Sequence, residues 1–213
     1  MYLLIVFLPL LGSVVSGCFG YRIGEKGSIS ITTVLVGISS LCSIYSVYEV
    51  GIVGNKVNIT IGRWVDVLDC NWGFKFDSLT VVMLVLVTVV STLVHIYSME
   101  YMEEDGHRSR FFSYLSLFTF FMIMLVTADN YLSMFLGWEV VGLCSYLLIN
   151  FWYTRIEANK SAIQAMLVNR IGDVGLALGV VLIYIEFGSL KYDTVFSFSN
   201  GIGENGLILK VIG

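Results

Sequence analysis

The most constraining feature of this chain is a series of apolar runs long enough to cross a lipid bilayer. A helix of about twenty residues, rising about 1.5 Å per residue, spans the hydrocarbon core of a membrane. Charged residues make up only 13% of the 213 residues, about half the share of a typical soluble domain. We therefore expect an all-α polytopic membrane protein. Six runs predict its spanning helices, at residues 1–21, 28–48, 79–99, 111–127, 130–153 and 161–185.

The segment between the second and third runs has a different periodicity. Apolar residues alternate there with polar ones, at Val57, Ile59 and Ile61. A period of two is typical of a strand, and residues 71–73 supply turn chemistry. A β-hairpin over about residues 55–77, at the membrane surface, is the expected structure. Three aromatic side chains suit the interfacial belt of such a segment, namely Trp64, Trp72 and Phe74.

The distribution of basic residues predicts the orientation of the helices. Short loops rich in lysine and arginine stay on the inner side of a membrane. The loops after the first, third and fifth runs carry such residues, at Arg22, Lys26, Arg108, Arg110, Arg155 and Lys160. The N-terminus and the hairpin are therefore expected on the outer side. The first run has no basic residue before it and is about twenty residues long, which favours a spanning helix over a signal peptide.

These patterns divide the chain into four parts. The first part, residues 1–54, holds two spanning helices, and the second, 55–78, is the hairpin loop. The third, 79–187, holds four further spanning helices with the charged residues, and the fourth, 188–213, is a surface segment. The surface segment has room for one short amphipathic helix. It ends in LILKVIG, the start of a further apolar run that is too short to cross a membrane.

Glu139 is the only formally charged residue between Asn130 and Thr154. On a helix it lies roughly 14 Å from the start of its run, near the bilayer midplane. An ionised carboxylate there costs at least several kcal/mol unless it is paired, hydrated or protonated. Ionisable residues inside membranes are usually functional for this reason. The alternative is a carboxylate satisfied by serine or tyrosine hydroxyls and kept for packing.

Arg170 and Asp173 form a second charged group in the sixth run. Their spacing of three residues places them on one helix face, where they can pair. A paired ion is far cheaper in lipid than two separate charges. They form either an internal salt bridge that only neutralises itself, or a pair that modulates the proton affinity of Glu139. In the second case Arg170 favours the ionised carboxylate, whereas Asp173 and burial oppose it.

The remaining candidate is His95, near the end of the third run. It is either an interfacial or a satisfied residue, or a proton relay. No phosphate-binding loop, GxGxxG, nucleophile elbow or zinc signature occurs. The four cysteines are far apart, and the net charge is only −4. The sequence therefore predicts no cofactor or metal in this chain and no nucleic-acid partner.

Three stretches carry a family resemblance. WGFKFDSLTVVMLVLVTVVSTLVHIYSMEYM, GWEVVGLCSYLLINFWYTR and NKSAIQAMLVNRIGDVGLALG together resemble subunit 5 of respiratory complex I, the NADH:ubiquinone oxidoreductase. MYLLIVFLPLLGS is similar to mitochondrially encoded versions. The glutamate motif alone is shared with Mrp-type sodium/proton antiporters.

The resemblance implies the N-terminal part of an antiporter-like fold. It makes Glu139 an essential protonatable group, with Asp173 and Arg170 on the same charged axis. Such a subunit holds no redox centre, so FMN, iron–sulfur clusters and ubiquinone are expected in partner subunits. It lies in the mitochondrial inner membrane, against lipids and other membrane-arm subunits of complex I. The expected function is proton translocation coupled to electron transfer from NADH to ubiquinone.

The chain also departs from the family pattern. Full members have more than a dozen spans, and the lysine that partners the glutamate lies on the seventh. Lys210 does not match that lysine motif. We therefore expect a second polypeptide to complete the subunit from the seventh span onward, although a truncated polypeptide is an alternative. Two other functions stay open: an Mrp-type sodium/proton antiporter subunit, and a non-conducting structural fragment of the membrane arm.

Overall fold

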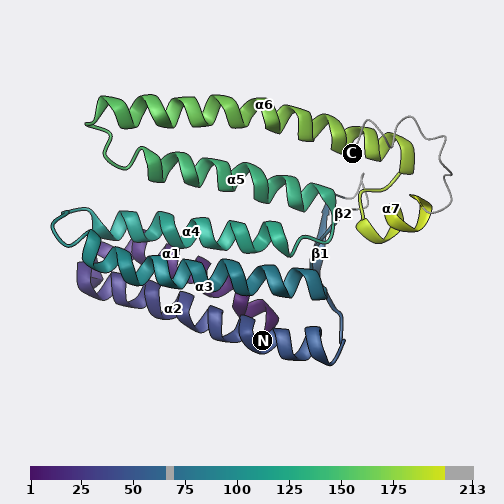
Figure 1. Ribbon diagram of the computed structural model, residues 1–213, viewed down its shortest axis with the longest axis horizontal. Helices are drawn as coiled ribbons and strands as arrows, with labels where there is room; N and C mark the ends of the chain where they lie inside the picture. Colours follow the sequence, from purple (N-terminus) through teal and green to yellow (C-terminus); the bar gives the residue numbers. More distant parts are fainter. Residues whose placement is uncertain (66–69, 200–213) are drawn as a thin grey trace.

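The computed structural model describes residues 1–65 and 70–199, and these are mostly helical (Figure 1). Six helices in the described residues are long and apolar enough to cross a membrane, which confirms the predicted number. They are α1 (Tyr2–Ile23), α2 (Glu25–Ser46), α3 (Ser78–Tyr101), α4 (Arg108–Val126), α5 (Tyr131–Ile149) and α6 (Ile156–Phe187). The predicted start of a seventh run, with Lys210, lies outside the described residues.

The helix ends follow local chemistry. The side chain of Asn130 accepts a hydrogen bond from the backbone N–H of Ser133 at 2.7 Å, so it caps the start of α5. Gly188, with φ of 65°, ends α6 in the left-handed conformation that glycine adopts without strain. With 32 residues, α6 is about 48 Å long and exceeds the hydrocarbon core of a bilayer. α2 continues into a π-helical turn, η1 (Val47–Ile52).

The first four helices form a bundle, and the last two extend it to one side. Figure 1 shows α5 beside α4 and α6 beside α5, with α1, α2 and α3 on the other side of α4. Small and hydroxylated residues line the bundle. Ser43 Oγ and Thr88 Oγ1 are 2.7 Å apart between α2 and α3, and Ser113 Oγ donates to the carbonyl oxygen of Ser13 at 2.9 Å. Such residues allow membrane helices to approach closely.

The predicted hairpin is confirmed. Strands β1 (Val57–Val65) and β2 (Cys70–Phe76) pair antiparallel, with Val57 opposite Phe76. The rings of Trp64 and Trp72 contact each other, 5.2 Å between centroids. The expectation of an interfacial position for Phe74 is wrong. Its side chain is buried against Phe7, in the same core cluster as Phe120, because this side of β2 covers the end of the bundle.

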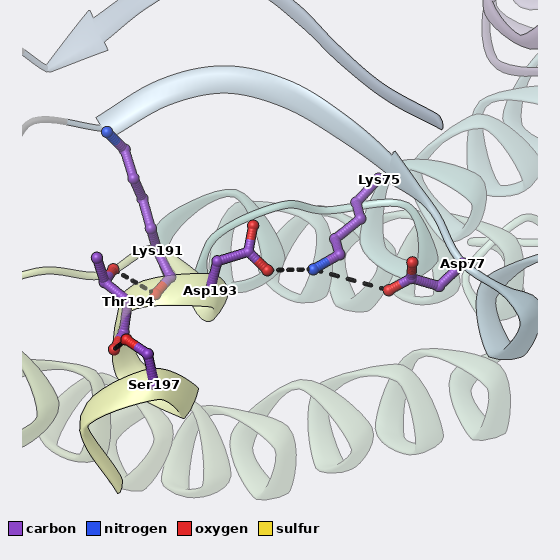
Figure 2. Close-up of polar contacts among 6 residues, drawn as sticks. All are labelled: Lys75, Asp77, Lys191, Asp193, Thr194 and Ser197. Carbon is purple, nitrogen blue, oxygen red and sulfur yellow. Dashed lines mark hydrogen bonds and ion pairs between the residues drawn. The ribbon is translucent and has the colours of Figure 1, made fainter. Parts of the chain in front are cut away.

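One ion pair connects the hairpin to α7 (Tyr192–Ser199), the short helix that follows α6. Lys75 Nζ lies 2.5 Å from Asp193 Oδ1 and 3.7 Å from Asp77 Oδ2 (Figure 2). Burial opposes the charged form of Lys75, but the hydrogen bond and charge of Asp193, with those of Asp77, raise its pKa above the usual value. In α7, Thr194 Oγ1 donates to the carbonyl oxygen of Lys191 at 2.9 Å, and Ser197 Oγ to that of Thr194 at 2.8 Å.

The N-terminus, the hairpin and α7 therefore lie at the same end of the molecule. The ring of Tyr2 lies 4.8 Å from that of Phe76, which places the start of α1 against β2. The backbone N–H of Lys75 donates to the carbonyl oxygen of Thr127, and that of Tyr192 to Asp129. The connections that carry the predicted inner basic residues follow α1, α3 and α5, and so lie at the opposite end. This arrangement agrees with the predicted placement of the N-terminus and the hairpin on one side.

Candidate functional site

The predicted intramembrane carboxylate has a charged partner. Arg170 Nη1 of α6 donates to Glu139 Oε2 of α5 at 2.8 Å. Both residues lie near the middle of their helices, so the ion pair is at membrane depth. The exposed fractions of the two side chains are 54% for Arg170 and 26% for Glu139. An ion pair is stronger where the local dielectric constant is low, so this contact compensates two charges that lipid would otherwise reject.

Asp173 has a different partner from the one that its spacing predicts. It lies one helical turn beyond Arg170 and is 8% exposed, but Trp138 Nε1 donates to its Oδ1 at 2.9 Å. In this structure Arg170 is therefore paired with Glu139, and its pairing with Asp173 stays a prediction. The spacing allows the pair, but α5 offers Arg170 a full negative charge on Glu139 and offers Asp173 an N–H donor.

A pocket of about 220 Å³ opens at this site between α5 and α6. A water molecule takes about 30 Å³ in the liquid, so the volume accommodates several waters. The lining combines ionisable and amide side chains with apolar ones: Glu139, Gly142, Leu143, Tyr146, Leu147, Met166, Asn169, Arg170 and Asp173. The three predicted residues of α5 and α6, Glu139, Arg170 and Asp173, thus line one pocket that is large enough for water.

The fourth predicted residue, His95, lies elsewhere. Its side chain is fully buried between α3 and α4, where Nδ1 donates to the carbonyl oxygen of Ser91 at 2.7 Å. Its Nε2 lies 3.1 Å from Ser116 Oγ. These contacts agree with the interpretation of His95 as a satisfied residue and not with an interfacial one. All residues that line the Glu139 pocket come from α5 and α6, so the structure does not bring His95 to this site. A relay role for His95 stays a prediction.

Trp138 was not predicted as part of the site. It belongs to the same GWE motif as Glu139, but an aromatic residue in an apolar helix is usually packing surface. The available signal was its position next to a membrane carboxylate, because an indole N–H needs an acceptor when it is removed from water.

Within residues 1–65 and 70–199, no group of three or more histidine, cysteine or acidic side chains is placed to hold a metal ion.

In the described residues, six helices able to span a membrane are combined with an ion pair and a further carboxylate near the middle of two of them, as expected for an antiporter-like membrane subunit. Two family models match this chain. Residues 64–112 match the N-terminus of NADH-ubiquinone oxidoreductase (complex I) chain 5, and residues 128–212 match the transmembrane region of the NADH:quinone oxidoreductase/Mrp antiporter family. The chain belongs to the family of antiporter-like membrane subunits that includes NADH-ubiquinone oxidoreductase chain 5.

Relatives named NADH-ubiquinone oxidoreductase chain 5 match nearly the whole chain. The relative from Marchantia polymorpha is 54% identical over 96% of this chain and 31% of its own length. That from Arabidopsis thaliana is 56% identical over 92% of this chain and 30% of its own length. That from Aspergillus niger is 54% identical over 100% of this chain and 32% of its own length. This chain thus spans about a third of the length of these curated relatives.

Two solved structures share the fold. One is the membrane-bound sulfane sulfur reductase, an archaeal respiratory membrane complex. Its TM-score is 0.83 at 18% identity, with 98% of this chain and 42% of that chain covered. The other is the Mrp complex from Dietzia sp. DQ12-45-1b. Its TM-score is 0.81 at 19% identity, with 98% of this chain and 22% of that chain covered. At these identities the likeness concerns the fold alone.

Proposed function

We propose that this chain is the N-terminal, proton-translocating part of an antiporter-like subunit of a respiratory complex I, in the mitochondrial inner membrane. Glu139 binds the proton, and electron transfer from NADH to ubiquinone in partner subunits drives its movement. The observation that carries the proposal is the 2.8 Å ion pair between Glu139 and Arg170 inside a pocket at membrane depth. The redox groups, FMN, iron–sulfur clusters and ubiquinone, belong to partner subunits in this proposal.

The mechanism is an exchange of ion pairs. In the observed arrangement Arg170 compensates the charge of Glu139. When Glu139 takes up a proton from water in the pocket, most of this attraction is lost. Arg170 is then free to turn toward Asp173, one turn away on the same helix face. Release of the proton from Glu139 restores the first pair. The protonation of one carboxyl group is thereby coupled to the position of one positive charge.

Replacement of Glu139 by glutamine tests this proposal. The Glu139→Gln variant retains the size of the side chain but cannot release a proton, so we expect assembly and NADH oxidation to survive and proton pumping to be lost. The measurement is proton uptake per NADH oxidised in vesicles that contain the assembled complex. Glu157→Gln is the matched control, because Glu157 pairs with Lys160 on an exposed part of α6. Normal pumping by the Glu139 variant would falsify the proposal.

The two alternative functions predict different results in the same vesicles. An Mrp-type antiporter subunit gives proton flux that sodium stimulates without NADH. A non-conducting structural fragment gives a complex whose pumping does not depend on Glu139. The family match of residues 64–112 to complex I chain 5 favours the proposed function over the first alternative.

We also propose that a second polypeptide covers the exposed face of the α5–α6 pair, on which Arg170 and Asn169 lie. Arg170 is more than half exposed and Asn169 is exposed, at a depth where lipid tails cannot bond to either. A spanning helix with a lysine would fit beside Glu139 and supply a further proton acceptor. Crosslinking mass spectrometry on the intact complex is expected to join α5 or α6 to another chain. The absence of any such chain near Glu139 would contradict this proposal.

A further inference from the structure

Consecutive residues of α5 bond to two residues of α6 that lie one turn apart. Successive side chains diverge by about 100° around a helix. Glu139 therefore reaches Arg170, and Trp138 reaches Asp173, at 2.8 and 2.9 Å. α5 runs antiparallel to α6, so a step forward along α5 corresponds to a step back along α6. The two bonds form one connected set across the α5–α6 interface.

The bond from Trp138 satisfies a carboxyl group that would otherwise be costly. Asp173 is 8% exposed, and its charged neighbour on α6 is engaged with Glu139. A buried carboxyl group without a hydrogen-bond partner is strongly unfavourable in a membrane. The indole Nε1–H only donates, so it holds Asp173 without itself accepting or releasing a proton.

The same chain shows what this kind of bond does outside the membrane. Trp152 Nε1 donates to Asp105 Oδ2 at 2.8 Å in the surface region that follows α5. This hydrogen bond, with that from the backbone of His107, holds the pKa of Asp105 below its usual value. An indole donor thus favours the ionised form of an aspartate. The Trp138–Asp173 bond joins the same two kinds of group at membrane depth.

We infer that Trp138 is a positioning residue for the ion-pair exchange: its indole holds Asp173 while Arg170 is paired with Glu139, and releases Asp173 when Arg170 turns to it. This inference rests on the proposed function and assigns a role to a residue that takes no proton itself. Without the indole donor, Asp173 competes with Glu139 for Arg170 at all times. The exchange then loses one of its two distinct states.

The surroundings of Trp138 leave space for this release. The residue is 51% exposed and lines a second pocket, of about 380 Å³, on the hairpin side of the site. Lys75 and Asp77 line the same pocket near β2, and Met134 lies one turn before Trp138 on α5. The ring therefore has room to change rotamer when its nitrogen leaves Asp173. Its nitrogen contacts a residue of the first pocket, while the ring lines the second.

The test uses the assembled membrane complex and two matched tryptophan variants. Trp138→Phe removes the N–H donor and retains an aromatic ring, so we expect pumping per NADH oxidised to fall severalfold, because Asp173 then competes with Glu139 for Arg170 throughout. Trp152→Phe removes the equivalent donor to Asp105 at the surface and is expected to pump normally. In an Asp173→Ala background, Trp138→Phe is expected to cause no further loss, because the residue acts through Asp173.

A spectroscopic measurement covers the case in which Trp138→Phe does not assemble. The vibrational band of a hydrogen-bonded indole N–H is expected to change when NADH drives the otherwise unaltered complex, and to show a free indole in Asp173→Ala. An unchanged band in both, or a further loss in the double variant, would overturn the inference. If Trp138→Phe pumps normally while Glu139→Gln does not pump, the inference about Trp138 is overturned and the proposed function stands. Normal pumping by Glu139→Gln would instead remove the proposed function on which it rests.

Discussion

Replacing Gly137 by valine is expected to disturb the packing of α4 against α5 and so to lower the amount of assembled subunit in the membrane. A Cβ atom at Gly137 would lie 2.9 Å from Leu125 Cα and 3.0 Å from Leu125 N. Both atoms belong to the backbone of α4, so neither can turn aside as a flexible side chain could. Overpacking of this kind typically costs about 1–3 kcal/mol, and the branched valine side chain adds further clashes to that of its Cβ.

The amount of assembled complex in membranes, measured on native gels, is expected to fall severalfold for Gly137→Val. Gly179→Ala is the matched control, because a Cβ at Gly179 on α6 meets no other atom within 4 Å. Alanine also has the higher helix propensity, so this variant is expected to assemble at least as well as the unaltered chain. Equal amounts of complex from the Gly137 variant would contradict the close approach of α4 and α5 at this point.

The spanning helices could be predicted from the sequence because the bilayer imposes one length and one polarity on each of them. The hairpin was also predictable, since its period of two differs from the helical runs around it. Helix ends were less exact. α6 begins at Ile156, before the expected residue 161, because the charged turn with Glu157 and Lys160 is compatible with a helix that extends beyond the lipid.

The partners of the charged residues could not be predicted in the same way. Spacing along α6 shows that Arg170 and Asp173 share a face, but it contains no information about which side chains of α5 lie opposite. That depends on the register of two antiparallel helices, which here places Trp138 and Glu139 against them. Phe74 illustrates the same limit, since strand periodicity alone could not show that its side of β2 covers the helix bundle.

The structure also separates two kinds of polar group inside the membrane. Many hydroxyl groups and His95 lie within the α1–α4 bundle, where bonds to carbonyl oxygens and to one another satisfy them. The charged groups lie between α5 and α6, beside a pocket and in the less buried part of the molecule. Buried hydroxyls fix helix packing, whereas a charge that has space and alternative partners can move. The α5–α6 pair is therefore the part of this chain in which charge exchange is possible.

Replacing Arg170 by glutamine is expected to cause the second large effect, because it leaves Glu139 without its cation. A charge at the centre of a membrane helix costs about 3 kcal/mol, so the amount of assembled complex is expected to fall. In whatever complex remains, pumping is expected to be lost, because the proposed exchange has no positive charge to move. Lys160→Gln is the matched control on the same helix, since it breaks the exposed pair with Glu157. Such surface pairs contribute little to stability.

A second substitution separates stability from function at this site. In Glu139→Gln with Arg170→Gln both charges are gone, so the cost of an unpaired charge disappears and assembly is expected to recover. Proton pumping is not expected to recover, because the double variant has neither the proton-binding carboxyl group nor the charge that responds to it. Native gels and proton uptake per NADH measure the two effects independently. Assembly that stays as low in the double variant as in Arg170→Gln would mean that Arg170 stabilises the membrane arm through contacts other than its bond to Glu139.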